Sequence, residues 1–316
     1  MDKLVIATRG SKLALWQSNH IKEKLQQLHP DLEIELKVFT TEGDKRLDTS
    51  LALIGGKGLF VKELEDAILR GEAHIAVNSL KDMPFQIPEG LKLSAITKRE
   101  DVRDVLLSDK YDDVESLPFG TTIGTSSLRR TMQLLALRPD LNIKPLRGNI
   151  DTRIEKLKKG EFDAIILASA GIDRLGLHNS VQNVYTILVS EIIPAMGQGA
   201  LGIETIDDPE VEKLVSPLND EVAMVETTVE RDFVKELDGG CTAPIGINAT
   251  LLENDTIIVK AVLGTPDGSE VLRDTIVGNK SEYQTLGKKL ADKMRERGAV
   301  EILQKATAML EEKNDS

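Results

Sequence analysis

Cysteine and long apolar runs are scarce in this sequence, and basic residues are outnumbered by acidic ones. The 316 residues include one cysteine, so no disulfide can form within the chain, and a lone cysteine fits a reducing compartment. No stretch approaches the roughly 20 apolar residues that span a bilayer, and the start of the chain lacks a basic segment followed by a long apolar one. We therefore expect a cytoplasmic protein with no membrane partner.

The charge balance is acidic. Asp and Glu number 52 against 40 Lys and Arg, which gives a net charge of −12. Such a field repels the phosphate backbone of nucleic acid, so we expect no nucleic-acid partner. Hydrophobic residues at 41% and charged residues at 29% are typical of a folded globular protein, and the length favours two or three domains.

The first third of the chain alternates strand and helix patterns. An apolar run at 4–8 precedes Ser11, which can cap a helix, and residues 33–38 alternate as a half-buried strand does. Strand patterns recur at 73–77 and 91–96, on either side of the turn-like KDMP. This order predicts an α/β layer.

A second run begins near residue 101 and repeats that order, with TTIGT, NIKPL and DAIILA as strands and SSLRRTMQLLAL and DTRIEKLKK as helices. VIATRGSKLALWQ and TIGTSSLRRTMQ also share a strand, a Thr, a Ser and a helix start. Ligands of open α/β sheets bind beyond the carboxyl ends of the strands. The paired turns would therefore place two such edges across a cleft.

The pattern changes from about residue 220. A helix that contains Val225 and Val229 leads to DGGC, and the strand-like segments INATLL, TIIVKAVLG and EVLRDTIVG follow, joined by turn signals. We predict an antiparallel sheet here and a helical tail at the end of the chain. The expected domains are an α/β domain of 1–97 with 198–216, a second α/β domain of 101–192, and a smaller α+β domain of 220–316.

Cys241 lies in ELDGGCTAPIG, where two glycines leave the thiol unhindered. A lone cysteine is more often a small buried hydrophobic residue than a nucleophile, and from the sequence both interpretations stay open. No Cys or His accompanies it at the spacing of metal ligands, so we expect no metal site.

Asp82 lies in NSLKDMP, directly after an apolar run and just before Pro84. A carboxylate at a strand end can stabilise a developing cation or accept an N–H hydrogen bond. Asp is equally common as a turn former that bonds its own backbone, and this interpretation also stays open.

GTSSLRR combines a helix start with two arginines. Ser126 and Ser127 can cap the helix, and Arg129 and Arg130 can bind an anion beside its first N–H groups. Arginine suits carboxylate or phosphate because its planar group donates paired hydrogen bonds. An ordinary helix cap with two surface arginines would give the same pattern.

The order and spacing of these motifs resemble those of porphobilinogen deaminases along nearly the whole chain. The motifs that carry the resemblance are IATRGS, GGKGLFVKELE, SLKDMP, REDVRD, GTSSLRR, LRGN, DAIILA, GQGALGIE and GGCTAPIG. The resemblance implies an α/β fold class, with two periplasmic-binding-protein-like α/β domains around a cleft and a smaller α+β C-terminal domain that carries the cofactor.

The resemblance also implies an activity. Porphobilinogen deaminases are transferases with hydroxymethylbilane synthase activity: they condense four porphobilinogen molecules head to tail, lose ammonia at each step, and release hydroxymethylbilane by hydrolysis, for porphyrin and haem biosynthesis. The implied partner is the small molecule porphobilinogen, and we expect a monomer.

A dipyrromethane cofactor, attached to Cys241 through a thioether, is implied as well. The family assigns Asp82 the catalytic role of bonding pyrrole N–H groups and stabilising the azafulvenium cation left when ammonia departs. Each pyrrole carries an acetate and a propionate, which arginines can bind. The cofactor-binding residues implied are Cys241, Lys81, Asp82, Thr125, Ser127, Arg129, Arg130, Arg147 and Gly148. The substrate-binding residues implied are Arg9, Ser11, Lys57, Phe60, Ser126, Arg147, Arg153 and Arg174.

Asn78 departs from the family pattern, because many members have a histidine before the SxKD motif. Asn cannot become cationic, although it can still hydrogen-bond.

Two other classes of protein would share parts of this pattern of motifs. A two-lobed binding protein would need no Cys241, and a phosphate-binding transferase would use the helix start at Ser126 and Ser127.

Overall fold

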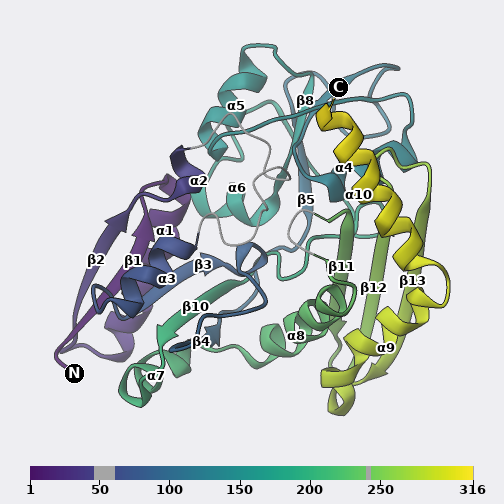
Figure 1. Ribbon diagram of the computed structural model, residues 1–316. Coiled ribbons are helices and arrows are strands. Elements are labelled where there is room, and N and C mark those ends of the chain that lie inside the picture. The colour runs from purple at the N-terminus through teal and green to yellow at the C-terminus, as the bar shows by residue number, and fades with distance from the viewer. Residues whose placement is uncertain (46–60, 240–242, 316) are drawn as a thin grey trace. The chain divides into compact units, whose positions relative to one another are not determined.

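The structure is a computed structural model that describes residues 1–45, 61–239 and 243–315 (Figure 1). The chain divides into two compact units. Unit 1 comprises Met1–Glu100 and Gly199–Met224, and unit 2 comprises Asp101–Gln198 and Val225–Ser316. The segment predicted as the second domain falls in unit 2, as does the segment predicted as the third domain apart from its first residues, 220–224. Each of the two segments has a sheet of its own.

Unit 1 contains a five-stranded sheet of order β2-β1-β3-β10-β4. Strand β1 is parallel to β2 and β3, whereas β10 is antiparallel to both of its neighbours because the chain returns to the sheet from unit 2. The elements are β1 (Lys3–Arg9), α1 (Lys12–Leu28), β2 (Glu33–Phe39), α2 (Glu42–Lys45), α3 (Lys62–Leu69), β3 (Ile75–Ser79), the 3₁₀ turn η1 (Leu80–Asp82), β4 (Leu91–Ile96), β10 (Leu201–Ile206), α7 (Pro209–Val215) and the 3₁₀ turn η2 (Ser216–Leu218).

Helices cover both faces of this sheet. The side chains of β1 therefore alternate between two hydrophobic cores, one on each face. Ile6 packs with Ile21 of α1 on one face, and Ala7 packs with Leu64 of α3 on the other. The segment 33–38 is a strand as expected, but Val38 is 56% exposed because β2 lies at the sheet edge.

The first part of unit 2 contains a five-stranded sheet of order β7-β6-β8-β5-β9. Strand β6 is parallel to β7 and β8, and β5 is antiparallel to β8 and β9. The elements are β5 (Asp104–Ser108), β6 (Thr122–Gly124), α4 (Leu128–Leu137), β7 (Asn142–Lys144), α5 (Ile150–Lys158), β8 (Ala164–Ala168), α6 (Ser169–Leu175) and β9 (Asn183–Thr186).

The two five-stranded sheets share one strand order and the same strand directions, in which β1, β3 and β10 correspond to β6, β8 and β5. Ser11 caps α1 by accepting a hydrogen bond from the Ala14 N–H, and Ser127 caps α4 by accepting one from the Arg130 N–H. The repeat seen in the sequence is therefore a repeat of the fold. Of the two serines expected at the second cap, Ser127 fills the position.

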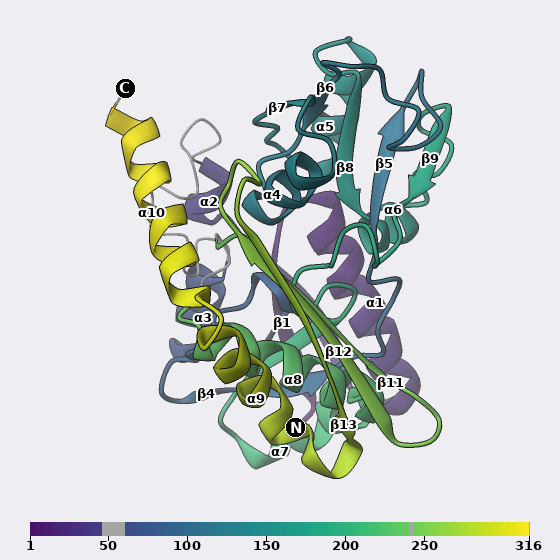
Figure 2. The same cartoon turned by 90° about the vertical axis from the view of Figure 1, so that its right-hand side faces the viewer.

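The second part of unit 2 is an antiparallel sheet of order β11-β12-β13, as the sequence predicts. Helices α8, α9 and α10 lie along one face of it (Figure 2). The elements are α8 (Glu221–Glu236), β11 (Ile245–Leu251), β12 (Thr256–Gly264), β13 (Val271–Asn279), the 3₁₀ turn η3 (Lys280–Glu282), α9 (Tyr283–Arg295) and α10 (Ala299–Asp315).

The helical tail consists of two helices rather than one. Between α9 and α10 Gly298 has a φ of +90°, a left-handed conformation that glycine adopts without strain. Within the described ranges, none of the helices is long and apolar enough to cross a membrane.

Candidate functional site

A small pocket of about 70 Å³ opens in unit 1 where β1 and β3 end. It lies at the carboxyl edge of two parallel strands, the position at which α/β sheets bind ligands. Its lining residues are Arg9, Ser11, Leu13, Ala14, Gln17, Val61, Val77, Asn78, Ser79 and Asp82.

Three predicted site residues meet in this pocket. Arg9 ends β1, Ser11 begins the turn to α1, and Asp82 ends the 3₁₀ turn after β3. The Asp82 side chain is exposed, and no described residue donates a hydrogen bond to its carboxylate. The pocket therefore presents a carboxylate that is open to a ligand, with an arginine in the same wall. Lys81 occupies the same 3₁₀ turn.

The pocket also contains polar residues that sequence reasoning did not assign. Gln17 donates a hydrogen bond from Nε2 to the Ser79 hydroxyl at 2.8 Å. Asn78 is 8% exposed, and its Nδ2 is buried without a hydrogen-bond partner among the described residues. A buried amide without a partner is rare in a folded protein and indicates a place for a ligand or a water. No signal in the sequence identifies Gln17, which lies within a helix.

In unit 2 the turn between β6 and α4 is tied to the loop after β7. The Ser126 hydroxyl donates to the Leu146 carbonyl at 2.9 Å and accepts from the Leu146 N–H at 3.1 Å. The Thr125 hydroxyl accepts from the Ser127 N–H at 3.2 Å. These bonds hold the GTSSLRR turn beside the loop that contains Arg147.

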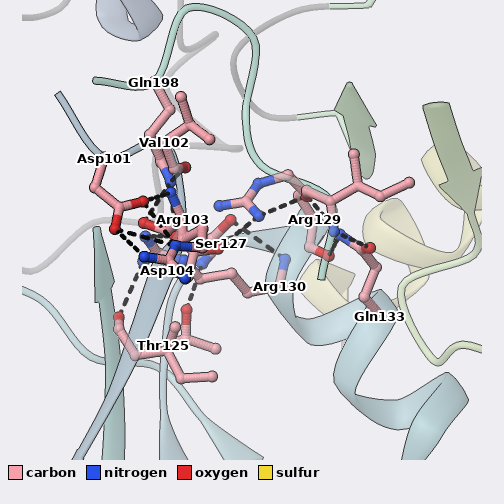
Figure 3. Close-up of polar contacts among 12 residues, drawn as sticks. Asp101, Val102, Arg103, Asp104, Thr125, Ser127, Arg129, Arg130, Gln133 and Gln198 are labelled. Carbon is pink, nitrogen blue, oxygen red and sulfur yellow. Dashed lines mark hydrogen bonds and ion pairs between the residues drawn. The ribbon is translucent and has the colours of Figure 1, made fainter. Parts of the chain in front are cut away.

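Arg129 and Arg130 are buried rather than on the surface. They are 5% and 6% exposed, and both donate to the carboxylate of Asp104, which is fully buried (Figure 3). The Arg129 Nη1 and the Arg130 Nη2 each lie 2.7 Å from that carboxylate. The helix cap in GTSSLRR is confirmed at Ser127, but the alternative in which the two arginines lie on the surface is wrong. Asp104 lies in the motif REDVRD, but nothing in the sequence shows that it meets the arginines.

The protonation states in this cluster follow from burial and charge. Burial alone would raise the pKa of Asp104, but the charges and hydrogen bonds of Arg129 and Arg130 hold it well below the ordinary value. Burial lowers the pKa of Arg129, Asp104 opposes that change, and the neighbouring Arg130 adds to it. Arginine stays protonated in proteins, so at neutral pH two cations share one anion.

The other cationic residues predicted for the site in unit 2 are Arg147, before α5, Arg153, on α5, and Arg174, on α6. The Arg153 Nε donates to the Gly148 carbonyl at 2.7 Å, which joins the first turns of α5 to the loop before it. Gly148 has a φ of +109°, and a Cβ there would press on Thr152, so glycine is required. Burial lowers the pKa of Arg147, and Arg174 on α6 is 9% exposed.

Three predicted site residues, Lys57, Phe60 and Cys241, lie outside the described residues. In the described part of the chain, no three His, Cys, Asp or Glu side chains are grouped so that they could hold a metal ion. Together the fold and the two clusters define a class: an α/β protein with two five-stranded sheets of the same strand order and with arginines at or beside their strand-to-helix turns.

Two family models together match most of the chain. "Porphobilinogen deaminase, dipyromethane cofactor binding domain" matches residues 4–213, and "Porphobilinogen deaminase, C-terminal domain" matches residues 224–296. A porphobilinogen deaminase of Sulfurimonas denitrificans is 58% identical over 99% of this chain and 100% of its own. One from a Nitratiruptor species is 62% identical over 97% of this chain and 98% of its own.

The chain belongs to the porphobilinogen deaminase family. It is an enzyme, a transferase of tetrapyrrole biosynthesis, and its cofactor is dipyrromethane. Solved structures with a similar outline include a TRAP periplasmic solute binding protein from Pseudomonas putida F1. It has 15% identity and a TM-score of 0.40, with 70% of this chain and 78% of that chain covered.

Proposed function

We propose that the pocket of unit 1 carries out the deamination step on porphobilinogen and that Asp82 is its catalytic carboxylate. The observation that carries this proposal is the exposed Asp82 carboxylate, to which no described residue donates, in a pocket that also contains Arg9 and Ser11. When ammonia leaves the substrate, positive charge develops on the remaining pyrrole. A carboxylate that is already in place stabilises such charge without reorganisation.

Arg9 has a different role in the same pocket. Its guanidinium can bind a carboxylate group of the substrate through paired hydrogen bonds, and Ser11 can add a hydroxyl donor. Lys81, beside Asp82, adds a proposed contact, and Lys57 and Phe60, which lie outside the described residues, complete the proposal. Under this proposal Arg9 binds and orients the substrate, and Asp82 acts on its transition state.

The cations of unit 2 suit the dipyrromethane cofactor, whose rings carry acetate and propionate groups. Arg129 and Arg130 exceed their partner Asp104 by one positive charge, and this buried surplus favours an anionic ligand. We propose that Thr125, Ser127, Arg129, Arg130, Arg147 and Gly148 contact the cofactor, and that Ser126, Arg153 and Arg174 contact the growing chain. The cofactor supplies a covalently held chain to which substrate units are added.

Replacement of Asp82 tests its role. In the variant Asp82→Asn we expect kcat to fall by about a hundredfold or more, because loss of one preorganised electrostatic group has that size of effect. Unfolding should be unchanged, since the side chain is exposed. The matched control is Asp31→Asn, an exposed aspartate of unit 1 away from the pocket. Near-normal kcat in the Asp82 variant would refute the role.

The intact mass of the purified protein tests the attachment of the cofactor. We expect the chain to be heavier than its sequence by two porphobilinogens less two ammonias, and the variant Cys241→Ala to have its unmodified mass. Incubation with porphobilinogen should convert any unmodified wild-type protein to the heavier form. An adduct that persists without Cys241 would contradict the proposed thioether.

We also propose that the enzyme acts as a cytoplasmic monomer without nucleic-acid or membrane partners. The single cysteine and the net charge of −12 support this proposal. Light scattering during size-exclusion chromatography would measure the mass in solution, and a dimer would contradict it.

A further inference from the structure

The carboxylate of Asp104 is the common acceptor for three side chains (Figure 3). Asp104 is the first residue of β5. Its Oδ2 accepts from the Arg129 Nη1 at 2.7 Å, and its Oδ1 accepts from the Arg130 Nη2 at 2.7 Å and from the Gln198 Nε2 at 2.9 Å. The two arginines follow one another on α4, so one buried carboxylate holds both.

A backbone carbonyl holds each guanidinium at a second point. Arg129 Nη1 also donates to the Ile193 carbonyl, and Arg130 Nη1 donates to the Ile166 carbonyl, both at 2.9 Å. Gln133 in turn bonds the Ile193 N–H and carbonyl, at 2.8 Å and 3.0 Å. Because a guanidinium is planar and rigid, two fixed points determine its orientation.

Each guanidinium keeps N–H groups that bond no described residue. On Arg129 the Nε and Nη2 have no partner among the described residues, and together they form the two-donor fork that matches a carboxylate. On Arg130 the Nε is buried and has no partner in the described part of the chain. A buried donor of this kind indicates a ligand.

The corresponding five-stranded sheet of unit 1 shows that the fold does not require charge at the positions of Asp104, Arg129 and Arg130. Asp104 pairs with the last residue of β8, as Leu201 of β10 pairs with the last residue of β3. Arg129 and Arg130 are the second and third residues of α4, as Leu13 and Ala14 are of α1. Asp104, Arg129 and Arg130 form a buried ion triad. Such a triad is no more stabilising than well-packed apolar residues, so stability alone does not explain its presence.

We propose that Asp104 is a positioning residue, which orients the Nε/Nη2 edge of Arg129 toward an anionic ligand and limits the surplus charge of the cluster to one. The identity of the ligand, a carboxylate of the pyrrole chain, rests on the proposed function. Asp104 itself does not touch the ligand. It acts through the geometry and the charge of the two arginines.

The test compares Asp104→Asn with the wild-type holoenzyme, with inorganic sulfate as an inhibitory probe. The amide has the same shape, but it removes the negative charge and turns a donor toward one guanidinium. We expect kcat to fall by about a hundredfold, the effect of a displacement near 1 Å. We expect sulfate to inhibit more strongly, on the order of fivefold, because the cluster gains one positive charge.

The matched control is Asp140→Asn. Asp140 also pairs with an arginine of unit 2, Arg138, at 2.7 Å, but outside this cluster. Its kcat and sulfate inhibition should equal those of the wild type. If Asp104→Asn lost activity with unchanged sulfate inhibition, Asp104 would be a structural residue only and the proposal would be overturned, as it would be by wild-type kcat.

The variant Asp104→Glu keeps the proposal testable if the Asn variant does not fold. It retains the charge and displaces the carboxylate by one methylene. We expect wild-type sulfate inhibition with a kcat reduced about tenfold or more, because orientation changes while charge does not. Wild-type kcat in this variant would overturn the proposal. Absence of porphobilinogen turnover in the wild type would instead refute the proposed function.

Discussion

The two strand-to-helix turns that begin α1 and α4 share a backbone design but differ in what they bury. Ser11 and Ser127 cap the two helices in the same way. Behind the first cap the fold places Leu13, Ala14 and Leu201, and the edge of the sheet opens into a pocket with one exposed carboxylate.

Behind the second cap the corresponding positions are Arg129, Arg130 and Asp104, and the edge of the sheet encloses a charge cluster with spare donors. The difference shows how one fold, used twice, carries an exposed carboxylate in unit 1 and buried cationic groups in unit 2. The strand order and the cap are common to both, and the two turns differ at these three positions.

The largest expected effect comes from giving unit 2 the side chains of unit 1. The triple variant Asp104→Leu, Arg129→Leu and Arg130→Ala should fold with wild-type or greater stability, because removal of a complete buried ion triad is often neutral or stabilising. Turnover should be undetectable. The free energy of unfolding of the single variant Arg129→Leu should be roughly 3 kcal/mol lower than that of the wild type, because this variant leaves part of the ion triad unpaired.

Urea unfolding measures the stability of each variant, and an assay of porphobilinogen turnover measures its activity. Matched stabilities of the single and triple variants would show that the three side chains do not act as one unit. The comparison of the two turns would then fail at these positions.

A second prediction concerns pH. The pKa of Asp104 is lowered in the folded state, so its contribution to stability is complete above the unfolded pKa of about 4 and is lost as pH falls toward the folded pKa. The gap in unfolding free energy between wild type and Asp104→Asn should be constant from pH 8 to about pH 5 and should shrink below about pH 4. Denaturant titrations at several pH values measure it, and a gap that widens in acid would contradict the assigned charge.

Asn78 allows a smaller test in unit 1. With Asn, residue 78 does not titrate, whereas Asn78→His should add an ionisation near the ordinary histidine pKa of about 6.5. Below that pH the imidazolium would attract the substrate carboxylates, so KM should fall about threefold in acid relative to the wild type. Profiles of kcat/KM against pH measure the change. Superimposed profiles would show that residue 78 does not face the ligand.

The smallest expected effects concern the caps themselves. Ser11→Ala and Ser127→Ala should each lower the unfolding free energy by about 1 kcal/mol, since each removes one cap acceptor. Thermal or urea unfolding measures the loss. If only one of the two variants lowered the unfolding free energy, the two turns would not be equivalent in structure.

The strands and helices of the repeated layers could be predicted because their signals are local. The cap at Ser11, the alternation over 33–38 and the apolar run DAIILA each depend on neighbouring residues and are confirmed. The antiparallel direction of β10 and β5 was not predicted, because each strand enters its sheet from the other unit and its direction is not set by any local pattern.

The candidate site could be predicted in part for the same reason. Arg9, Ser11 and Asp82 lie at strand ends that the sequence shows, and the pocket brings them together. Asn78 and Gln17 face the same pocket, but the orientation of a side chain on a strand or helix depends on packing against the rest of the unit.

The sequence by itself determined the family, the order of the elements, and the residue types available for anions, because motifs and periodicity are properties of neighbouring residues. Only the tertiary structure decided that Arg129 and Arg130 are buried on Asp104. That carboxylate is 25 residues from one arginine and 26 from the other along the chain. The pairing of β5 with β8 brings it to them, and desolvation makes the three charges depend on one another.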